Sequence, residues 1–173
     1  LWVSAMDCFS LLPLLFAPDL DVDLTVSTIP LPPDPGEAGE ATIEGIDANT
    51  NGVRDDVERF IVFSYPENTP AHANTRNALF QYAEAAQEGL MVAEDKEAAR
   101  AEGEKLDRAQ NCLWAVRGTD AGNTSTSILT AQLFDTVART RQWSTFNQQL
   151  SGLVSILEPD GEILSSDCSF EIQ

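Results

Sequence analysis

Apolar residues recur at helical spacing through most of the second half of the chain. Two stripes have steps of three or four residues: Leu79, Ala83, Ala86 and Leu90, then Leu106, Ala109, Leu113 and Val116. Residues three and four apart lie on one side of a helix, so each stripe predicts a helix with one buried face. No proline falls between residues 71 and 158, which leaves that whole region compatible with helices.

A third stripe predicts the last helix. Its members are Leu129, Leu133, Val137, Trp143, Phe146 and Leu150. The phase slips between its two halves, which favours a bend near residues 139–141, and Gly152 ends the helix. The stretch from Gly118 to Asn123 indicates a turn before this helix. Beyond it, the apolar residues around P-D-G in residues 153–164 favour a small β-hairpin.

The first 45 residues follow no helical pattern. Residues 1–53 hold nine Asp and Glu without one Lys or Arg, and P-L-P-P-D-P-G at residues 30–36 is typical of a stiff, extended spacer. Residues 1–17 are apolar, as in a signal remnant or an arm that packs on another surface. We predict an extended, Pro-rich acidic arm over residues 1–45, offered to a protein partner or to a second copy, and a helical domain over residues 46–173.

Residues 47–58 read D-A-N-T-N-G-V-R-D-D-V-E and match the calcium-loop pattern D-x-[DN]-x-[DN]-G-x₅-E. Ca²⁺ takes six to eight oxygen ligands, which a short loop supplies from alternate residues. Gly52 permits the sharp turn, and the backbone carbonyl of Val53 is one expected ligand. The predicted ligands are Asp47, Asn49, Asn51, Val53, Asp55 and Glu58, and the predicted cofactor is Ca²⁺. The alternative is a polar turn that caps the following helix.

The residues around this loop differ from those of a paired EF-hand. Arg54 takes the position where paired loops usually carry an apolar residue, and residues 36–45 contain three glycines without an apolar stripe. We therefore expect an extended approach to the loop, and the spacing of Val57, Phe60 and Ile61 predicts a helix after it. The loop resembles the single calcium loops of thrombospondin type 3 repeats and dockerins. The predicted fold is mainly α, a small bundle of about four helices with one EF-hand-like calcium loop.

The net charge limits the possible partners of the protein, and its cysteines bear on the cellular location. The formal net charge is −18, which argues against nucleic acid and against an anionic membrane surface as partners. A disulfide between Cys112 and Cys168 would close a loop of about 57 residues and contribute roughly 4 kcal/mol in the chain-entropy model. Such a bridge predicts an extracytoplasmic protein that is secreted, periplasmic or at the cell surface. Two free thiols are the alternative, and Cys8 is left over.

Signs of catalysis are sparse. His72 is the single histidine and lies in a polar turn, and no nucleophile motif surrounds it. Acidic pairs such as Glu102 with Glu104 suit a metal shell or a solvated helix face.

Three segments of the chain together resemble a group of exported bacterial proteins without an established activity: residues 45–61, A-Q-N-C-L-W at 109–114, and residues 140–152. We expect a calcium-binding helical protein with a structural, binding or assembly role. The alternatives are a secreted hydrolase with a structural calcium ion and a low-affinity calcium sensor.

Overall fold

A computed structural model of the chain describes residues 29–153 and 165–173. Within these ranges the chain forms α-helices and short 3-10 helices, and no strand occurs there. The elements are η1 (Gly36–Glu40), α1 (Asp55–Ser64), α2 (Pro70–Met91), α3 (Lys96–Arg117), α4 (Thr119–Leu133), α5 (Val137–Gln149) and η2 (Ser165–Asp167). The prediction of a mainly α fold is thereby confirmed.

Three of the helices begin at side-chain caps. Thr69 accepts a hydrogen bond from His72 N at the start of α2, where Pro70 takes the first helical position. Asp95 accepts from the backbone of the first turn of α3, and Thr136 accepts from Arg139 N at the start of α5. These oxygens satisfy N–H groups that have no partner inside the helix.

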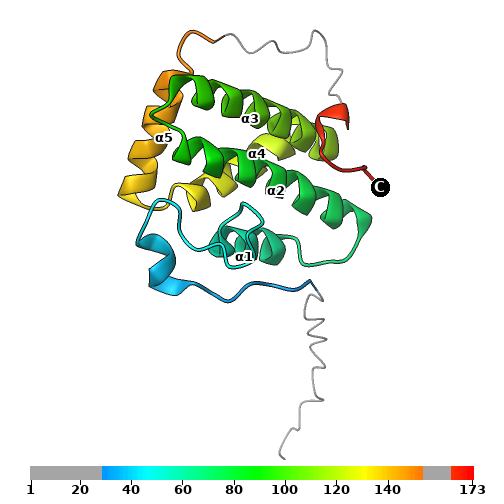
Figure 1. Cartoon of the computed structure of the whole chain (residues 1–173). Helices are drawn as coiled ribbons and strands as arrows, with labels where there is room; N and C mark the ends of the chain where they lie inside the picture. The colour runs from blue at the N-terminus through cyan, green and yellow to red at the C-terminus, as the bar shows by residue number, and fades with distance from the viewer. Residues whose placement is uncertain (1–28, 154–164) are drawn as a thin grey trace, which may run out of the picture.

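The two longest helices, α2 and α3, form the centre of the bundle. They make the most extensive helix–helix contact and run side by side in Figure 1, with α1 against α2 and α5 across one end. The predicted stripes supply the main core: Leu79, Ala83 and Ala86 from α2 pack with Ala109 and Leu113 from α3. Val57 and Ile61 of α1 are also fully buried, so the expected helix after the loop is present and faces the core.

The turn predicted from Gly118 to Asn123 was wrong, because helix α4 begins at Thr119. Gly118 alone reverses the chain, with a φ of 77° that glycine adopts without strain. A Cβ at Gly122 would lie 2.7 Å from Trp114 Cδ1, so this glycine lets α4 pack tightly against α3. Small polar residues fit inside α4 because their hydroxyls donate to carbonyls one turn back, as Ser125 does to Ala121 O.

The prediction of one last helix was also wrong. Helix α4 ends at Leu133 and a separate helix, α5, begins at Val137. The bend expected near residues 139–141 therefore lies earlier, and the described residues hold five α-helices where about four were expected. The Thr136 cap fixes the start of α5. Phe146 of α5 is fully buried in a second small core with Ala93 and Ala99, which explains why the apolar phase changes along this stretch.

The approach to the loop is not fully extended. Residues 36–40 form the 3-10 helix η1, in which Gly39 is buried, and residues 29–45 run along the body beside α1 (Figure 1). Arg59 of α1 donates to Pro32 O, which holds the start of this segment. The predicted signal remnant at residues 1–17 and nearly all of the hairpin at residues 153–164 lie outside the described residues.

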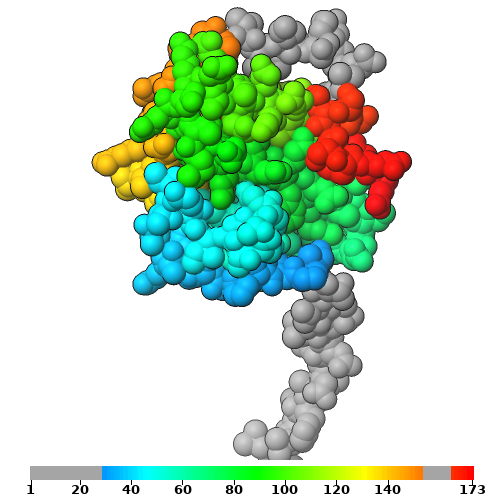
Figure 2. Space-filling model, in the orientation of Figure 1, coloured from blue at the N-terminus to red at the C-terminus, as the bar shows by residue number. Residues whose placement is uncertain are grey.

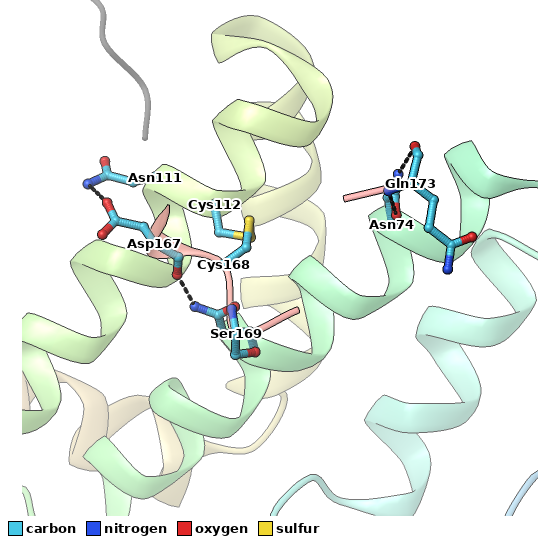
Figure 3. Close-up of a disulfide and its surroundings, with 8 residues drawn as sticks. Asn74, Asn111, Cys112, Asp167, Cys168, Ser169 and Gln173 are labelled. Atoms are coloured by element: carbon cyan, nitrogen blue, oxygen red, sulfur yellow. Dashed lines mark hydrogen bonds between the residues drawn. A yellow bond between two sulfur atoms is a disulfide. The ribbon is translucent and has the colours of Figure 1, made fainter. Parts of the chain in front are cut away.

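A disulfide joins Cys112 of α3 to Cys168 in the C-terminal tail, as the sequence predicted. Figure 3 shows the tail crossing the ends of α2 and α3. Asn111 donates to Asp167, Gln81 binds Asp167 O and Ser169 N, and Asn74 exchanges hydrogen bonds with the backbone of Gln173. The tail is thus fixed at both ends. None of the described helices has the length and apolar character needed to cross a bilayer.

Candidate metal site

The side chains of the predicted calcium loop fold inward upon one another. Asp47 accepts hydrogen bonds from the backbone N–H groups of Asn51 and Gly52, at 3.2 and 2.9 Å. Glu58, eleven residues along the chain, accepts from the side-chain amides of Asn49 and Asn51 at 2.9 and 3.0 Å. The first, third, fifth and last positions of the loop therefore meet in one small volume. Gly52 turns the chain there with a φ of 86°.

Asp55 closes the other side of the loop. Its side chain accepts from Ala48 N at 3.0 Å, and its own N–H donates to Ile46 O at 2.8 Å, so the two ends of the loop are tied together. The side chain of Val53 packs in the main core, which anchors the middle of the loop. The side chains of the other five predicted ligands are joined by hydrogen bonds within the loop, and Val53 contributes its N–H to Asn51 Oδ1 at 2.9 Å.

Two acidic groups of the loop, Asp55 and Glu58, are buried and have no cationic partner among the described residues. Asp55 is 1% exposed and Glu58 is 7% exposed. Among the described residues, neither they nor Asp47 forms an ion pair with Lys, Arg or His; their hydrogen-bond donors are neutral amide groups. Buried charges in proteins are normally paired or bind metal ions, because an unpaired charge loses its hydration. The negative charge of Asp55 and Glu58 is therefore not compensated by a cationic side chain of the described residues.

The loop residues carry oxygen ligands of the kind that a hard cation prefers. No group of three or more His, Cys, Asp or Glu in the described ranges is arranged to hold a metal by itself. The loop combines its carboxylates with the amide oxygens of Asn49 and Asn51 and with backbone carbonyls, and an all-oxygen set of this kind suits Ca²⁺. Each such oxygen has more than one acceptor position, so it can hold the loop together and also face a cation.

Arg54, which lies inside the loop sequence, points away from the loop and into the helical body. It is fully buried, and its guanidinium donates to Leu133 O and Gln132 O at the end of α4. The same group binds both oxygens of Asp56 at 3.0 and 2.8 Å and lies 3.6 Å from Asp135. The residue that would face a second loop in a paired EF-hand thus fastens this loop to the bundle. Sequence spacing gave no indication of this role.

A second buried arginine holds the segment before the loop. Arg139 of α5 is fully buried and donates to Gly39 O, to Thr42 O at 2.9 Å and to Ile43 O at 3.1 Å. Its remaining arm binds Asp135 at 2.8 Å, so Asp135 joins the two arginines. These contacts satisfy carbonyls within and just after η1, where no helix or sheet hydrogen bonds would do so.

One side chain of helix α2 binds both the loop and the segment before it. Gln87 Oε1 accepts from Arg54 N at 3.2 Å, and its amide donates to Glu44 O at 3.3 Å. Gly45, between these points, has a φ of 68°, and a Cβ there would come within 2.4 Å of Arg54 Cδ and 2.8 Å of Arg139 Nη2. Only glycine fits this position. The loop is therefore held by α2 and α4 as well as by α1, and α5 holds the segment before it.

The Arg54–Asp56 pair also makes stability depend on pH. Burial alone would raise the pKa of Asp56, but its hydrogen bonds with Arg54 and the positive charge of that residue outweigh burial and hold the pKa below its ordinary value. The unfolded chain therefore binds the proton more tightly than the folded chain does. The contribution of Asp56 is present above its ordinary pKa and is lost as the pH falls through the lowered one.

We expect Asp56→Asn to be less stable than the wild type at neutral pH, with a difference that shrinks as the pH falls below about 4. Urea unfolding of both proteins at several pH values between neutral and acid measures this difference. Asp34→Asn is the matched control, because the Asp34 side chain is mostly exposed and makes only a long contact with Arg59 Nη2, at 3.8 Å. A difference that stays constant with pH would contradict the assignment of the pair.

His72, the only histidine, has a structural position in the first turn of α2 rather than in a free loop. Its Nδ1 accepts a hydrogen bond from Glu67 N, and its ring packs edge-on against Tyr65 at 5.6 Å between centroids. These contacts join the α1–α2 connection to the start of α2. The imidazole is thus used in holding that turn.

Comparison of the chain with family models, with curated proteins and with solved structures finds no significant match. The site is therefore interpreted from its own geometry.

Proposed function

We propose that this chain is an extracytoplasmic calcium-binding protein in which one Ca²⁺ ion stabilises a helical body that serves a structural, binding or assembly role. The observation that carries the proposal is the burial of Asp55 and Glu58 in a loop that contains no cation partner for them. Asp47, Asn49, Asn51 and Glu58 already meet in the loop interior. A bound Ca²⁺ supplies the positive charge that these side chains lack.

The anchors of the loop support a stabilising ion. Arg54, Gln87 and Arg139 fix the loop and the segment before it to three other helices. Ion binding to the loop therefore stabilises contacts that are far apart in the sequence. The anchoring by Arg54 favours a loop that becomes more rigid when the ion binds. The helix opening by which sensor EF-hands work would break the buried hydrogen bonds of Arg54.

The disulfide supports the proposed location. Cys112 is fully buried and bonded to Cys168, and bridges of this kind persist in oxidising compartments. Extracellular calcium is abundant, so a site of modest affinity would remain filled there. An assembly role through the N-terminal arm concerns mainly residues 1–28, which lie outside the described residues.

Thermal unfolding tests the proposal. We expect the melting temperature of the chelated protein to rise with calcium added between micromolar and ten-millimolar concentrations. At ten times the dissociation constant, the ion adds about 1.4 kcal/mol by mass action, which corresponds to a shift of roughly 2–6 °C for a domain of this size. Asp47→Ala removes the first ligand and should abolish the shift.

Two controls make this measurement specific. Asp120→Ala removes an exposed aspartate in the first turn of α4, outside the loop, and should keep the full calcium response. Magnesium at the same concentrations should give a smaller response, because the smaller ion requires stricter octahedral geometry. Equal shifts in the wild type and in Asp47→Ala would refute a site in this loop.

A further inference from the structure

A surface pocket lies beside the calcium loop, between that loop and helices α2 and α3. Its volume is about 420 Å³, within the range of small-molecule sites in proteins. Gly52 of the loop forms part of its wall and lies against Glu84 of α2, whose Cγ would be 3.2 Å from a Cβ at that position. Figure 2 shows the loop segment in cyan packed directly against the green helices. The loop and the bundle thus build the pocket together.

The pocket lining is strongly charged and of mixed sign. Glu84 and Glu88 come from α2, while Glu102, Lys105 and Arg108 come from α3. Ala85 is the one apolar side chain in this lining, so the charged groups determine which ligands the pocket can orient. Three carboxylates stand against two cations, which leaves an excess of one negative charge on the lining.

Glu102 is the informative residue in this lining. It is only 8% exposed, although the sequence suggested a solvated helix face, and its neighbour Glu104 is exposed. Lys105 donates to Oε1 at 2.7 Å, while Oε2 is buried and has no hydrogen-bond partner among the described residues. A buried carboxylate oxygen without a donor is costly unless another group supplies one. The terminal torsion of glutamate is broad, so either oxygen can turn to the opening.

The remaining groups restrict what that donor can be. The ammonium of Lys105 is held at Glu102 by a 2.7 Å hydrogen bond, and this bond and the charges of the three glutamates keep the pKa of Lys105 above its ordinary value. Lys105 and Arg108 oppose a second divalent ion, because like charges repel at this range. Arg108 has no hydrogen bond or ion pair within the described part of the chain, which leaves its guanidinium available to a carboxylate.

We propose that this pocket binds a small zwitterion of net positive charge, of the chemical class of a basic amino acid or a basic dipeptide. Its two cationic groups pair with Glu102 and with Glu84 or Glu88, and its carboxylate pairs with Arg108. Two positive charges and one negative charge on the ligand balance the charges of the lining. The site adds a ligand to the proposed calcium-binding function and does not depend on that function.

Titration calorimetry with L-lysine as the probe tests the site, on the full chain with millimolar calcium and again after chelation. We expect saturable binding of L-lysine and weaker binding of putrescine, which lacks the carboxylate, and no binding of L-glutamate. Glu102→Gln should weaken L-lysine binding at least about tenfold, because a charge-assisted hydrogen bond is lost. Glu104→Gln, an exposed change two residues away, should leave it unchanged.

The Arg108→Gln variant tests whether Arg108 binds the carboxylate of the ligand. It should weaken L-lysine binding and leave putrescine binding unchanged, since putrescine has no carboxylate for Arg108. The proposal is overturned if L-lysine fails to bind the folded wild type, or if Glu102→Gln and Glu104→Gln bind it equally. The calcium response of the melting temperature is read from the same samples. Failure of the ligand site is thereby distinguished from failure of the calcium site.

Discussion

Replacing Arg139 by methionine is expected to destabilise the protein strongly, because Arg139 is fully buried and holds the segment before the loop. The substitution removes four hydrogen bonds of a fully buried guanidinium and leaves the Gly39, Thr42 and Ile43 carbonyls without their donor. It also leaves Asp135 with only the longer contact to Arg54. Loss of one partner from a buried ionic network costs about 3–5 kcal/mol. Urea unfolding at neutral pH measures the difference.

Two further variants show whether the guanidinium itself is responsible. Arg139→Lys keeps the positive charge and loses the planar fork, so its stability should fall between those of the wild type and the methionine variant. Arg141→Met is the matched control, because Arg141 is exposed on the same helix, and surface changes usually alter stability by less than about 0.5 kcal/mol. A loss below about 1 kcal/mol in Arg139→Met would mean that the network is not a major anchor.

The second large effect is expected from removing the disulfide. Alanine at both Cys112 and Cys168 should reduce the free energy of unfolding by about 4 kcal/mol, because the bridge closes a long loop in the unfolded chain. Alanine is preferred to serine, since Cys112 is fully buried in the core and a hydroxyl there would lack a partner. Denaturant unfolding of the two proteins under non-reducing conditions measures the difference.

The same variant has a local consequence that a general loss of stability would not produce. Without the bridge, the described part of the tail is held by the side chains of Asn74, Gln81 and Asn111 and by the packing of Phe170 against the main core (Figure 3). Hydrogen exchange at Ser169 and Gln173, whose N–H groups bind Gln81 and Asn74, should become faster than exchange in α2. Cys8→Ala is the control and should leave both stability and exchange unchanged. Equal protection of the tail amides in the wild type and in the double-alanine variant would contradict this account.

The features of the structure that could be predicted are those decided by residues close together in the sequence. The stripes of α1, α2 and α3 follow from spacings of three and four. The proposal of a calcium loop rests on five motif positions within twelve residues. The Cys112–Cys168 pairing was predictable because only three cysteines exist and one lies in the arm. The errors at the α3–α4 and α4–α5 junctions arose where one residue, Gly118 or the Thr136 cap, decides the chain direction.

The anchors of the site were beyond sequence reasoning. Arg54 binds carbonyls 78 and 79 residues away, and Arg139 binds carbonyls almost a hundred residues before it. An isolated arginine in an acidic chain indicates an exposed charge, and nothing in its neighbours specifies a buried carbonyl cluster as its partner. Glu102 shows the same limit, because its burial depends on how α2 and α3 pack rather than on its position in α3.

The central claim, that residues 47–58 bind one calcium ion, is tested most directly by titrating the chelated full chain with calcium and measuring stoichiometry by calorimetry. The account predicts one ion per chain in the wild type, with binding lost in Glu58→Gln and retained in Glu104→Gln. Glu58→Gln keeps the size of the side chain and its contacts with Asn49 and Asn51, and removes only the negative charge. Absence of calcium binding in the wild type, or an unchanged stoichiometry in Glu58→Gln, would contradict the claim.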